Sequence, residues 1–220
     1  MNRRFDLVVF DFDGTLADSQ NLLVGLVNDV LAAHGLPRAP ERAVAECIGL
    51  PLAIVFRRNL EAAEDEQIAT LCRFYRAHAD TQEFVRQFRL FPGVRATLEH
   101  LRAAGSRVAI GTSKGHATTH DILRHCRIDD VIDAVVGGDS VKQGKPHPET
   151  VEQLLDRLDA RRERTLMVGD TSFDIEMGHA AGVSTCAVTY GMQPEAALRQ
   201  LKPTFMIDRI EELKAIVNWE

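Results

Sequence analysis

Residues 7–19 read LVVFDFDGTLADS, and this stretch decides the fold class of the chain. The apolar run Leu7 to Phe10 predicts a short strand that is buried on both faces. Two acidic residues, Asp11 and Asp13, follow the run directly. Ligands of open α/β sheets bind at the carboxyl ends of the strands. The stretch therefore predicts a buried strand that ends at a functional sheet edge.

The rest of the chain divides into a helical part and an alternating part. From Asp18 to about Phe91 apolar residues recur at helical spacing, and no convincing strand interrupts them. After Pro92, helical segments alternate with short apolar segments, which predicts a parallel sheet wound by helices. The predicted strands of this part are 107–110, 134–136, 165–168 and 185–188. We therefore expect an α/β fold in which residues 1–15 and 92–220 form the sheet domain and residues 16–91 an inserted all-helical cap domain.

Composition excludes several classes of protein. The chain has 220 residues, of which 45% are hydrophobic, so it is long enough to bury a core without disulfides. Its net charge of −6 argues against a nucleic-acid-binding protein. No apolar run reaches the length of a membrane span, so no membrane contact is expected. The four cysteines are scattered without a C-x-x-C pair, which favours a reducing, cytoplasmic location.

Polar residues follow each predicted strand, and the carboxyl ends of parallel strands meet at one edge. The second strand is followed by Thr112 and Ser113, the segment after the third contains Lys145, and the fourth is followed by Asp170 and Asp174. Lysine is rare here, with five in the chain, so a lysine within such a segment is notable.

Four carboxylates at one edge cannot stand without a counter-charge. Two unit charges about 4 Å apart repel by roughly 4 kcal/mol at an effective dielectric constant of 20. A hard divalent cation removes this cost, and a site with few carboxylates that also holds a phosphate suits Mg²⁺. Hydroxyl, backbone N–H and ammonium groups at the same edge can hold phosphate oxygens. The residues predict a Mg²⁺-dependent site for a phosphorylated ligand.

These segments, in this order, resemble the four motifs of the phosphatases of the haloacid dehalogenase superfamily. The first motif is matched by residues 11–19, the second by Thr112, the third by Lys145 within Gly-Lys-Pro-His-Pro-Glu, and the fourth by residues 169–174. The resemblance covers nearly the whole chain, and the subgroup it is most similar to is phosphoglycolate phosphatase-like with a C1-type helical cap. It implies a Rossmann-like core.

The resemblance also implies a role for each matching residue. Asp11 would attack phosphorus and become an aspartyl-phosphate. Asp13 would protonate the leaving oxygen and then deprotonate the hydrolytic water, and its backbone carbonyl would bind Mg²⁺. Lys145 would neutralise charge on Asp11 and on the phosphate.

The remaining matches imply phosphate and metal contacts. Thr112 and the N–H of Ser113 would hydrogen-bond the transferring phosphoryl group. Asp170 would bind Mg²⁺ directly, and Asp174 would bind it or hold a ligating water. The side chain of Asp11 completes the implied metal site.

The implied activity is Mg²⁺-dependent hydrolysis of a small phosphorylated metabolite, such as a phosphoglycolate-like monoester. Asp13 favours a phosphate ester over a carbon–halogen bond, and the absence of lysine between residues 19 and 89 counts against a phosphonate. A sugar phosphomutase, a pyrophosphatase and a binding protein without turnover stay open as alternatives. Monomer and homodimer also stay open.

Substrate selection is expected in the cap. The turn Ile48 to Pro51 is expected to face the active site, and Arg57 or Arg58 either binds a second anionic group or is solvated. His116 and His120 lie four residues apart, and a solvated helix face explains them better than a zinc site.

Overall fold

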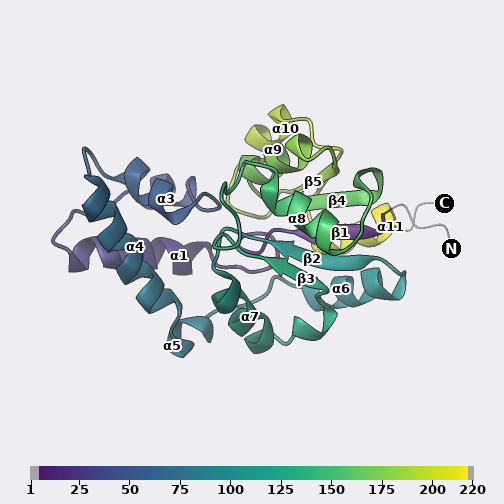
Figure 1. Ribbon diagram of the computed structural model, residues 1–220, viewed down its shortest axis with the longest axis horizontal. Coiled ribbons are helices and arrows are strands. Elements are labelled where there is room, and N and C mark those ends of the chain that lie inside the picture. The colour runs from purple at the N-terminus through teal and green to yellow at the C-terminus, as the bar shows by residue number, and fades with distance from the viewer. Residues whose placement is uncertain (1–4, 218–220) are drawn as a thin grey trace.

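A parallel six-stranded sheet forms one half of the molecule, and a helical insert forms the other (Figure 1). The computed structural model describes residues 5–217. Both ends of the described chain lie at the end of the sheet that is far from the insert. The strands are β1 (Leu7–Phe10), β2 (Arg107–Gly111), β3 (Ala134–Val136), β4 (Thr165–Gly169), β5 (Ser184–Val188) and β6 (Phe205–Ile207).

Strand β1 is central, and the sheet order is β3-β2-β1-β4-β5-β6. Val9 of β1 is in register with Ala109 of β2 on one side and with Met167 of β4 on the other. The strand order reverses at β1, and such a switch point is where open α/β sheets bind ligands at their carboxyl edge. The topology therefore places the segment that follows β1 at the centre of the candidate site.

Helices cover both faces of the sheet because the strands alternate their side chains between two apolar clusters. Leu7 and Val9 of β1 belong to one cluster, which α8 and α9 cover, whereas Val8 and Phe10 belong to the other, which α6, α7 and α11 cover. The helices of this half are α6 (Val94–Ala103), α7 (His116–His125), α8 (Glu149–Arg157), α9 (Ser172–Ala180), α10 (Glu195–Gln200) and α11 (Leu213–Val217). Short 3₁₀ helices occupy Asp129–Val131, Arg162–Arg164 and Ile210–Glu212.

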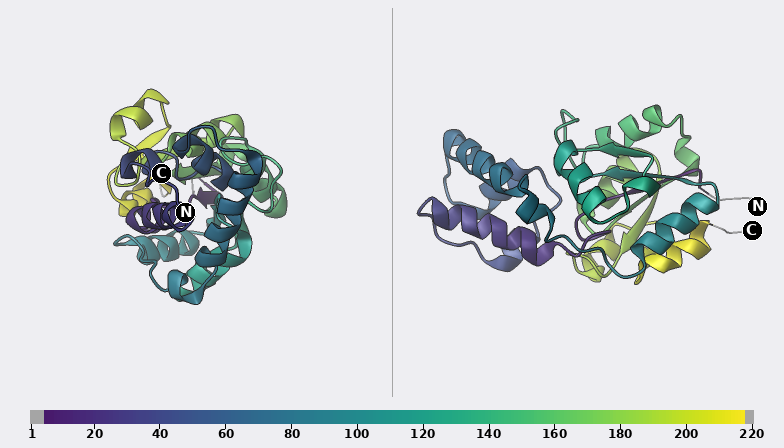
Figure 2. Two further views of the ribbon diagram at one scale, coloured as in Figure 1. Left: turned by 90° about the vertical axis from the view of Figure 1, so that its left-hand side faces the viewer. Right: turned by 90° about the horizontal axis from the view of Figure 1, so that it is seen from below.

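The helical insert lies between β1 and β2 in the chain and beyond the carboxyl edge of the sheet in space (Figures 1 and 2). Its apolar residues pack on one another, and Phe56 and Leu71 are fully buried. Gly35 ends its first helix at a φ of +70°, a conformation that glycine adopts without strain. The insert consists of α1 (Gln20–Ala33), α2 (Glu41–Ala45), α3 (Leu52–Asn59), α4 (Asp65–Ala79) and α5 (Gln82–Val85).

Two segments run side by side where the chain enters and leaves the insert. The N–H of Phe91 donates to the carbonyl of Leu16 at 2.9 Å, and the N–H of Asp18 donates to the carbonyl of Arg89 at 2.9 Å. This pairing supports the proposed division into a cap of residues 16–91 and a core of residues 1–15 and 92–220. Residues 1–4 and 218–220 of that core lie outside the described residues.

The predicted α/β fold with its inserted helices is confirmed. The last strand predicted from the sequence ends at residue 188, however, and the structure adds β6 and the helices α10 and α11 after that point. Like β3, strand β6 is an edge strand of three residues, but only Ile207 of it is buried, and it lacks the longer apolar run of the inner strands. Within residues 5–217, no helix combines the length and the apolar character needed to cross a bilayer.

Candidate active site

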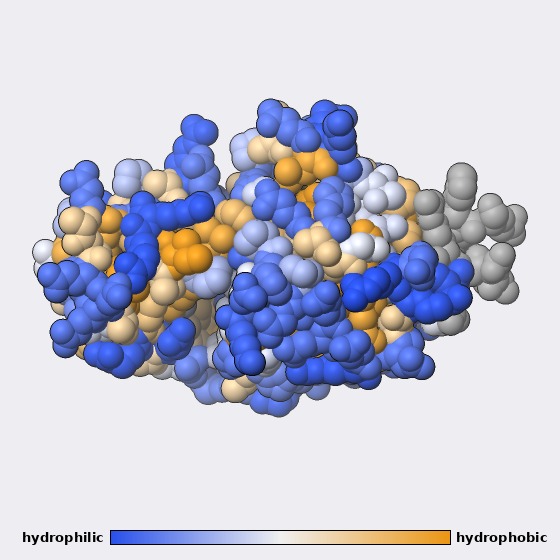
Figure 3. Space-filling model, turned by 45° about the horizontal axis from the view of Figure 1, so that its top comes forward, coloured by the Kyte–Doolittle hydropathy of each residue, from blue (hydrophilic) through white to orange (hydrophobic). Residues whose placement is uncertain are grey.

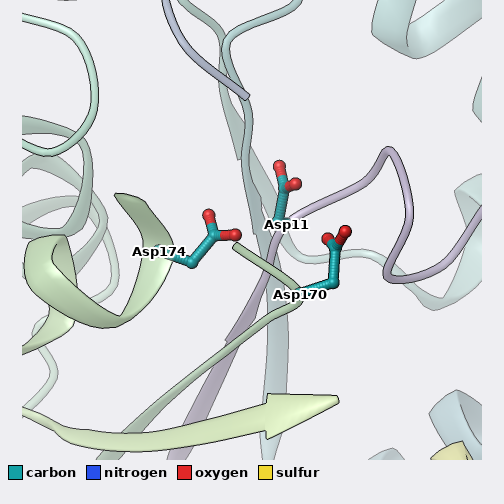
Figure 4. A group of neighbouring side chains, drawn as sticks. All are labelled: Asp11, Asp170 and Asp174. Carbon is teal, nitrogen blue, oxygen red and sulfur yellow. The ribbon is translucent and has the colours of Figure 1, made fainter. Parts of the chain in front are cut away.

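Three buried carboxylates from two segments of the chain meet at the carboxyl edge of the sheet (Figure 4). Asp11 follows β1, Asp170 follows β4, and Asp174 lies in the first turn of α9. One carboxylate oxygen from each lies within 4.8 Å of the other two. The structure thus brings together three of the predicted metal ligands.

Lys145 supplies the positive charge inside this group. Its Nζ donates to Asp11 Oδ1 at 2.5 Å and to Asp174 Oδ1 at 2.7 Å, and its side chain is only 1% exposed. A buried ammonium between two carboxylates is stable only because the three charges are paired. The predicted lysine therefore lies against the predicted nucleophile.

Further hydrogen bonds fix the two carboxylates of the last motif. Asp170 accepts from Thr15 Oγ1 at 2.7 Å through Oδ1 and from the N–H of Met192 at 2.9 Å through Oδ2. Asp174 Oδ2 accepts from the Thr171 N–H at 3.1 Å and from Thr171 Oγ1 at 2.6 Å, which forms a capping box at the start of α9. One Asp174 oxygen thus caps the helix while the other faces Lys145.

Glycine gives these carboxylates the space that they occupy. Gly14 has a φ of +81°, and a Cβ there would overlap the carboxylate of Asp170. A Cβ at Gly169 would overlap the side chain of Asp174 in the same way. The glycines beside the acidic residues are therefore a packing requirement of the site, in addition to a requirement of the turn.

Burial and mutual repulsion shift the titration of the group. Burial raises the pKa of Asp11 well above its usual range, and the negative charges of Asp174, Asp170 and Asp13 raise it further, while Lys145 opposes the shift. Burial and the charge of Asp174 raise the pKa of Asp170 to about 7. Burial lowers the pKa of Lys145, but Asp11 and Asp174 more than compensate and the net pKa is raised. One ammonium is too little counter-charge for three buried carboxylates.

The donor set fits a divalent metal ion. Oxygen ligands from a few carboxylates, beside space for a phosphate, are the surroundings that Mg²⁺ prefers. A divalent cation would also provide the missing positive charge. Asp11, Asp170 and Asp174 are therefore a candidate metal site.

We expect the metal-free protein to lose stability as the pH rises. The folded-state pKa of Asp170, about 7, lies above its ordinary value of 3.8. A carboxyl group with a raised folded pKa stabilises the fold below its unfolded pKa, and this contribution is lost as the pH rises through about 7. Urea unfolding in EDTA should therefore show a lower midpoint at pH 8 than at pH 5.5. Addition of Mg²⁺ should raise the midpoint more at pH 8, and an unchanged pH 8 midpoint would contradict the metal site.

Asp13 is buried but points to a different set of partners. Its Oδ1 accepts from Ser19 Oγ at 2.8 Å, and its Oδ2 pairs with Lys114 Nζ at 3.2 Å. Its side chain is not one of the three clustered carboxylates. Ser19 does precede α1, but its side chain makes no cap hydrogen bond to the helix. The Ser19 hydroxyl therefore supports Asp13 and does not cap the helix.

Thr112 and Ser113 lie at the end of β2, as predicted. Thr112 is buried, and its Oγ1 accepts from the N–H of Lys114 at 3.2 Å. Ser113 Oγ donates to the carbonyl of Gly49 at 2.5 Å, so this hydroxyl links the sheet half to the helical insert. The phosphate contacts implied for both residues stay predictions, as do the catalytic and metal roles of the other site residues.

A cavity of about 590 Å³ lies between the insert and the sheet edge. The space-filling view shows the molecule hollowed between its two halves, with apolar surface bordering the hollow on the side of the insert (Figure 3). Asp13, Ser113 and Lys114 line the cavity from the sheet half. The insert contributes the turn from Ile48 to Pro51, as expected, and Tyr75 and Arg76 of α4.

Two further expectations concern an arginine of the cap and the histidine pair of α7. Arg57 pairs with Asp65 on the surface of the insert and does not line the cavity. Nε2 of His116 and Nε2 of His120 lie 3.3 Å apart on α7, and among residues 5–217 no third His, Cys, Asp or Glu joins them in a group that could hold a metal ion. The preferred interpretation of a helix face without zinc therefore stays a prediction.

Comparison with known proteins matches residues 8–188 to the haloacid dehalogenase-like hydrolase family. Pyrophosphatase PpaX from Bacillus cereus is 33% identical over 215 residues, which covers 98% of this chain and 97% of that protein. Pyrophosphatase PpaX from Halalkalibacterium halodurans is 32% identical over 211 residues and covers 96% of each chain.

Solved structures give the same match. A haloacid dehalogenase-like hydrolase from Bacteroides fragilis superposes with a TM-score of 0.90 at 31% identity, over 95% of this chain and 99% of that chain. A Haemophilus somnus protein described as a predicted phosphoglycolate phosphatase superposes with a TM-score of 0.84 at 29% identity, over 97% of this chain and 98% of that chain.

Proposed function

The chain belongs to the haloacid dehalogenase-like hydrolases, and from this premise we propose that it is a Mg²⁺-dependent phosphohydrolase with Asp11 as the nucleophile. The observation that carries the proposal is the position of Asp11, paired with the Lys145 ammonium and clustered with the carboxylates of Asp170 and Asp174. An ionised nucleophile needs such a counter-charge in a buried site. The helical insert between β1 and β2 corresponds to the C1 cap of this family.

The proposed reaction has two steps. A carboxylate oxygen of Asp11 attacks phosphorus, the bond to the leaving oxygen breaks, and Asp13 gives that oxygen a proton. Asp13 then takes a proton from water, whose oxygen attacks phosphorus and displaces Asp11, which releases phosphate. Lys145 and the hydroxyl of Thr112 would stabilise the charge on the phosphoryl oxygens. Mg²⁺ held by Asp11, Asp170 and Asp174 would supply the main charge compensation.

We propose inorganic pyrophosphate as the first substrate and phosphoglycolate as the second. The pyrophosphatases that match nearly the full chain at 32–33% identity support the first. The Haemophilus somnus structure supports the second. Both compounds carry a second anionic group beside the scissile phosphoryl group, and the cavity wall offers Lys114 to such a group.

The test is phosphate release from both compounds with Mg²⁺ and with EDTA. We expect turnover that requires Mg²⁺ and yields inorganic phosphate. A ³¹P NMR spectrum of a sugar phosphate reaction separates this activity from a phosphomutase, which would return a regioisomer. A folded protein that hydrolyses neither compound, nor any of a broad panel of phosphate esters, would favour a binding protein without turnover.

A further inference from the structure

Lys114 is an almost buried cation beside the proposed general acid. Its side chain is 10% exposed, and its Nζ lies 3.2 Å from Asp13 Oδ2. The same Nζ lies 5.0 Å from the centre of the Phe88 ring, a cation–π contact that restrains it from the side of the insert. Because Lys114 also lines the cavity, its ammonium can reach a ligand there without leaving its surroundings.

Lys114 contacts the carboxylate oxygen from which Asp13 would donate a proton as general acid. Oδ1 of Asp13 already accepts from Ser19, so Oδ2 is the atom available for a proton on its way to a leaving oxygen. The Lys114 ammonium forms an ion pair with that atom at 3.2 Å. Proton donation from Asp13 therefore requires Lys114 to exchange Asp13 for another anionic partner.

The cavity offers room for such a partner close to Lys114. Helix α7 begins beside it, with Gly115, Ala117 and Thr118 in the wall, and the amino end of a helix favours negative charge. The three acidic residues that the structure describes in the cavity wall each have a partner in the protein. Asp13 pairs with Lys114, Asp80 accepts from Thr118, and Asp139 accepts from the N–H of His116.

Two further cations face the same space. Among the described residues that line the cavity, Arg76 of the insert and Lys142 of the sheet half carry positive charge in addition to Lys114. Both are exposed, whereas Lys114 is nearly enclosed. A charge-assisted hydrogen bond is strongest where water is excluded. Of the three cations, Lys114 is therefore the best hydrogen-bond donor to an anionic ligand.

We propose that Lys114 forms a subsite for a second anionic group on the leaving side of the substrate, and that this group releases Asp13 by taking over the ammonium. The inference rests on the proposed phosphohydrolase activity and names its substrate class. Substrates carry a phosphoryl or carboxylate group adjacent to the scissile phosphoryl group. A simple monoester leaves Lys114 on Asp13 and is turned over poorly.

Matched substrates test this subsite directly. Phosphate release is measured for pyrophosphate and phosphoglycolate and for two esters that lack the second anion, ethyl phosphate and 2-hydroxyethyl phosphate. For Lys114→Met we expect kcat/KM to fall by about 10- to 100-fold with the two substrates that carry a second anion. With the two esters we expect kcat/KM to rise, because the variant no longer holds Asp13 in an ion pair. Lys114→Arg should keep the preference, and Lys202→Met, which changes an exposed lysine that does not line the cavity, should behave as the wild type.

The pattern over substrates decides the outcome. Equal losses with all four compounds would show that Lys114 only supports Asp13, and would overturn the subsite. The larger of the two specific losses identifies the second anion as phosphoryl or carboxylate.

A binding measurement keeps the test independent of turnover. Calorimetry with Mg²⁺ compares methylenediphosphonate, which has two anionic groups and cannot be hydrolysed at its carbon bridge, with methylphosphonate. We expect Lys114→Met to weaken binding of the first by at least about tenfold and of the second only slightly. Equal affinities of wild type and variant for methylenediphosphonate would overturn the subsite even if the protein hydrolysed none of the substrates.

Discussion

Asp11→Asn is expected to lower kcat by at least about 10⁴-fold, because a carboxamide cannot form the aspartyl-phosphate. The change keeps the shape of the side chain. It removes one negative charge from a group in which burial and the charges of Asp174 and Asp170 raise the pKa of Asp11. It also weakens the 2.5 Å ion pair with Lys145. These two effects on stability oppose each other, so the variant is expected to stay folded.

The measurement is single-turnover phosphate release at saturating Mg²⁺, together with a urea unfolding curve for each protein. Asp156→Asn is the matched control, because it makes the same chemical change at an exposed position of α8. Residual activity above about one percent in Asp11→Asn would contradict nucleophilic attack by this residue. Loss of activity with loss of the unfolding transition would count as misfolding, and trapping of a phosphorylated aspartate in wild-type protein would then decide the role of Asp11.

Topology explains why so much of the site could be predicted from the sequence. Each of Asp11, Lys145 and Asp170 follows a predicted strand or lies in the segment beyond one, and parallel strands end at one edge. Their convergence in the structure needs only the correct strand assignment. The α/β fold, the inserted helices and the family are confirmed for the same reason, since alternating β and α segments limit the possible arrangements.

Contacts that depend on the path of loops could not be predicted. Thr15 and Tyr190 are joined by a hydrogen bond from Tyr190 Oη to the carbonyl of Thr15 at 2.9 Å, although 175 positions separate them. The N–H of Met192 reaches Asp170 from a loop with no helical or strand pattern. Main-chain donors leave no signature in the residue types, so the contact of Met192 with Asp170 stays hidden in the sequence.

The residues that contact Asp13 could be predicted from the sequence only in part. Ser19 has the residue type and position of a helix cap, and only the structure shows that its hydroxyl turns to Asp13 instead. Lys114 did carry a signal, because lysine is rare in this chain and this one directly follows the second motif. Its direction, toward Asp13 and the cavity, depends on how α7 leaves the sheet, and no residue pattern encodes that path.

Lys145→Met is expected to have the largest effect on stability of any substitution in the site. The variant keeps the length of the side chain but leaves Asp11 and Asp174 without their buried counter-charge. Removal of one partner of a buried ion pair typically costs about 3–5 kcal/mol of unfolding free energy. Activity should fall by at least about 10²-fold, because the charge on the nucleophile and on the phosphoryl group loses its ammonium partner.

The pH and metal dependence of this loss distinguishes an electrostatic cause from a packing defect. Burial already raises the pKa of Asp11, and loss of the Lys145 charge raises it further above its unfolded value. Protonation at low pH therefore restores stability, and a rise in pH removes it. In EDTA, the deficit relative to wild type should therefore be smaller at pH 5.5 than at pH 8, and Mg²⁺ should raise the melting temperature of the variant more than that of wild type. Lys202→Met controls for the loss of a lysine at an exposed position. A deficit that is equal at both pH values and insensitive to Mg²⁺ would mean that Lys145 stabilises the site by packing alone, and the charge balance on which the proposed chemistry depends would be wrong.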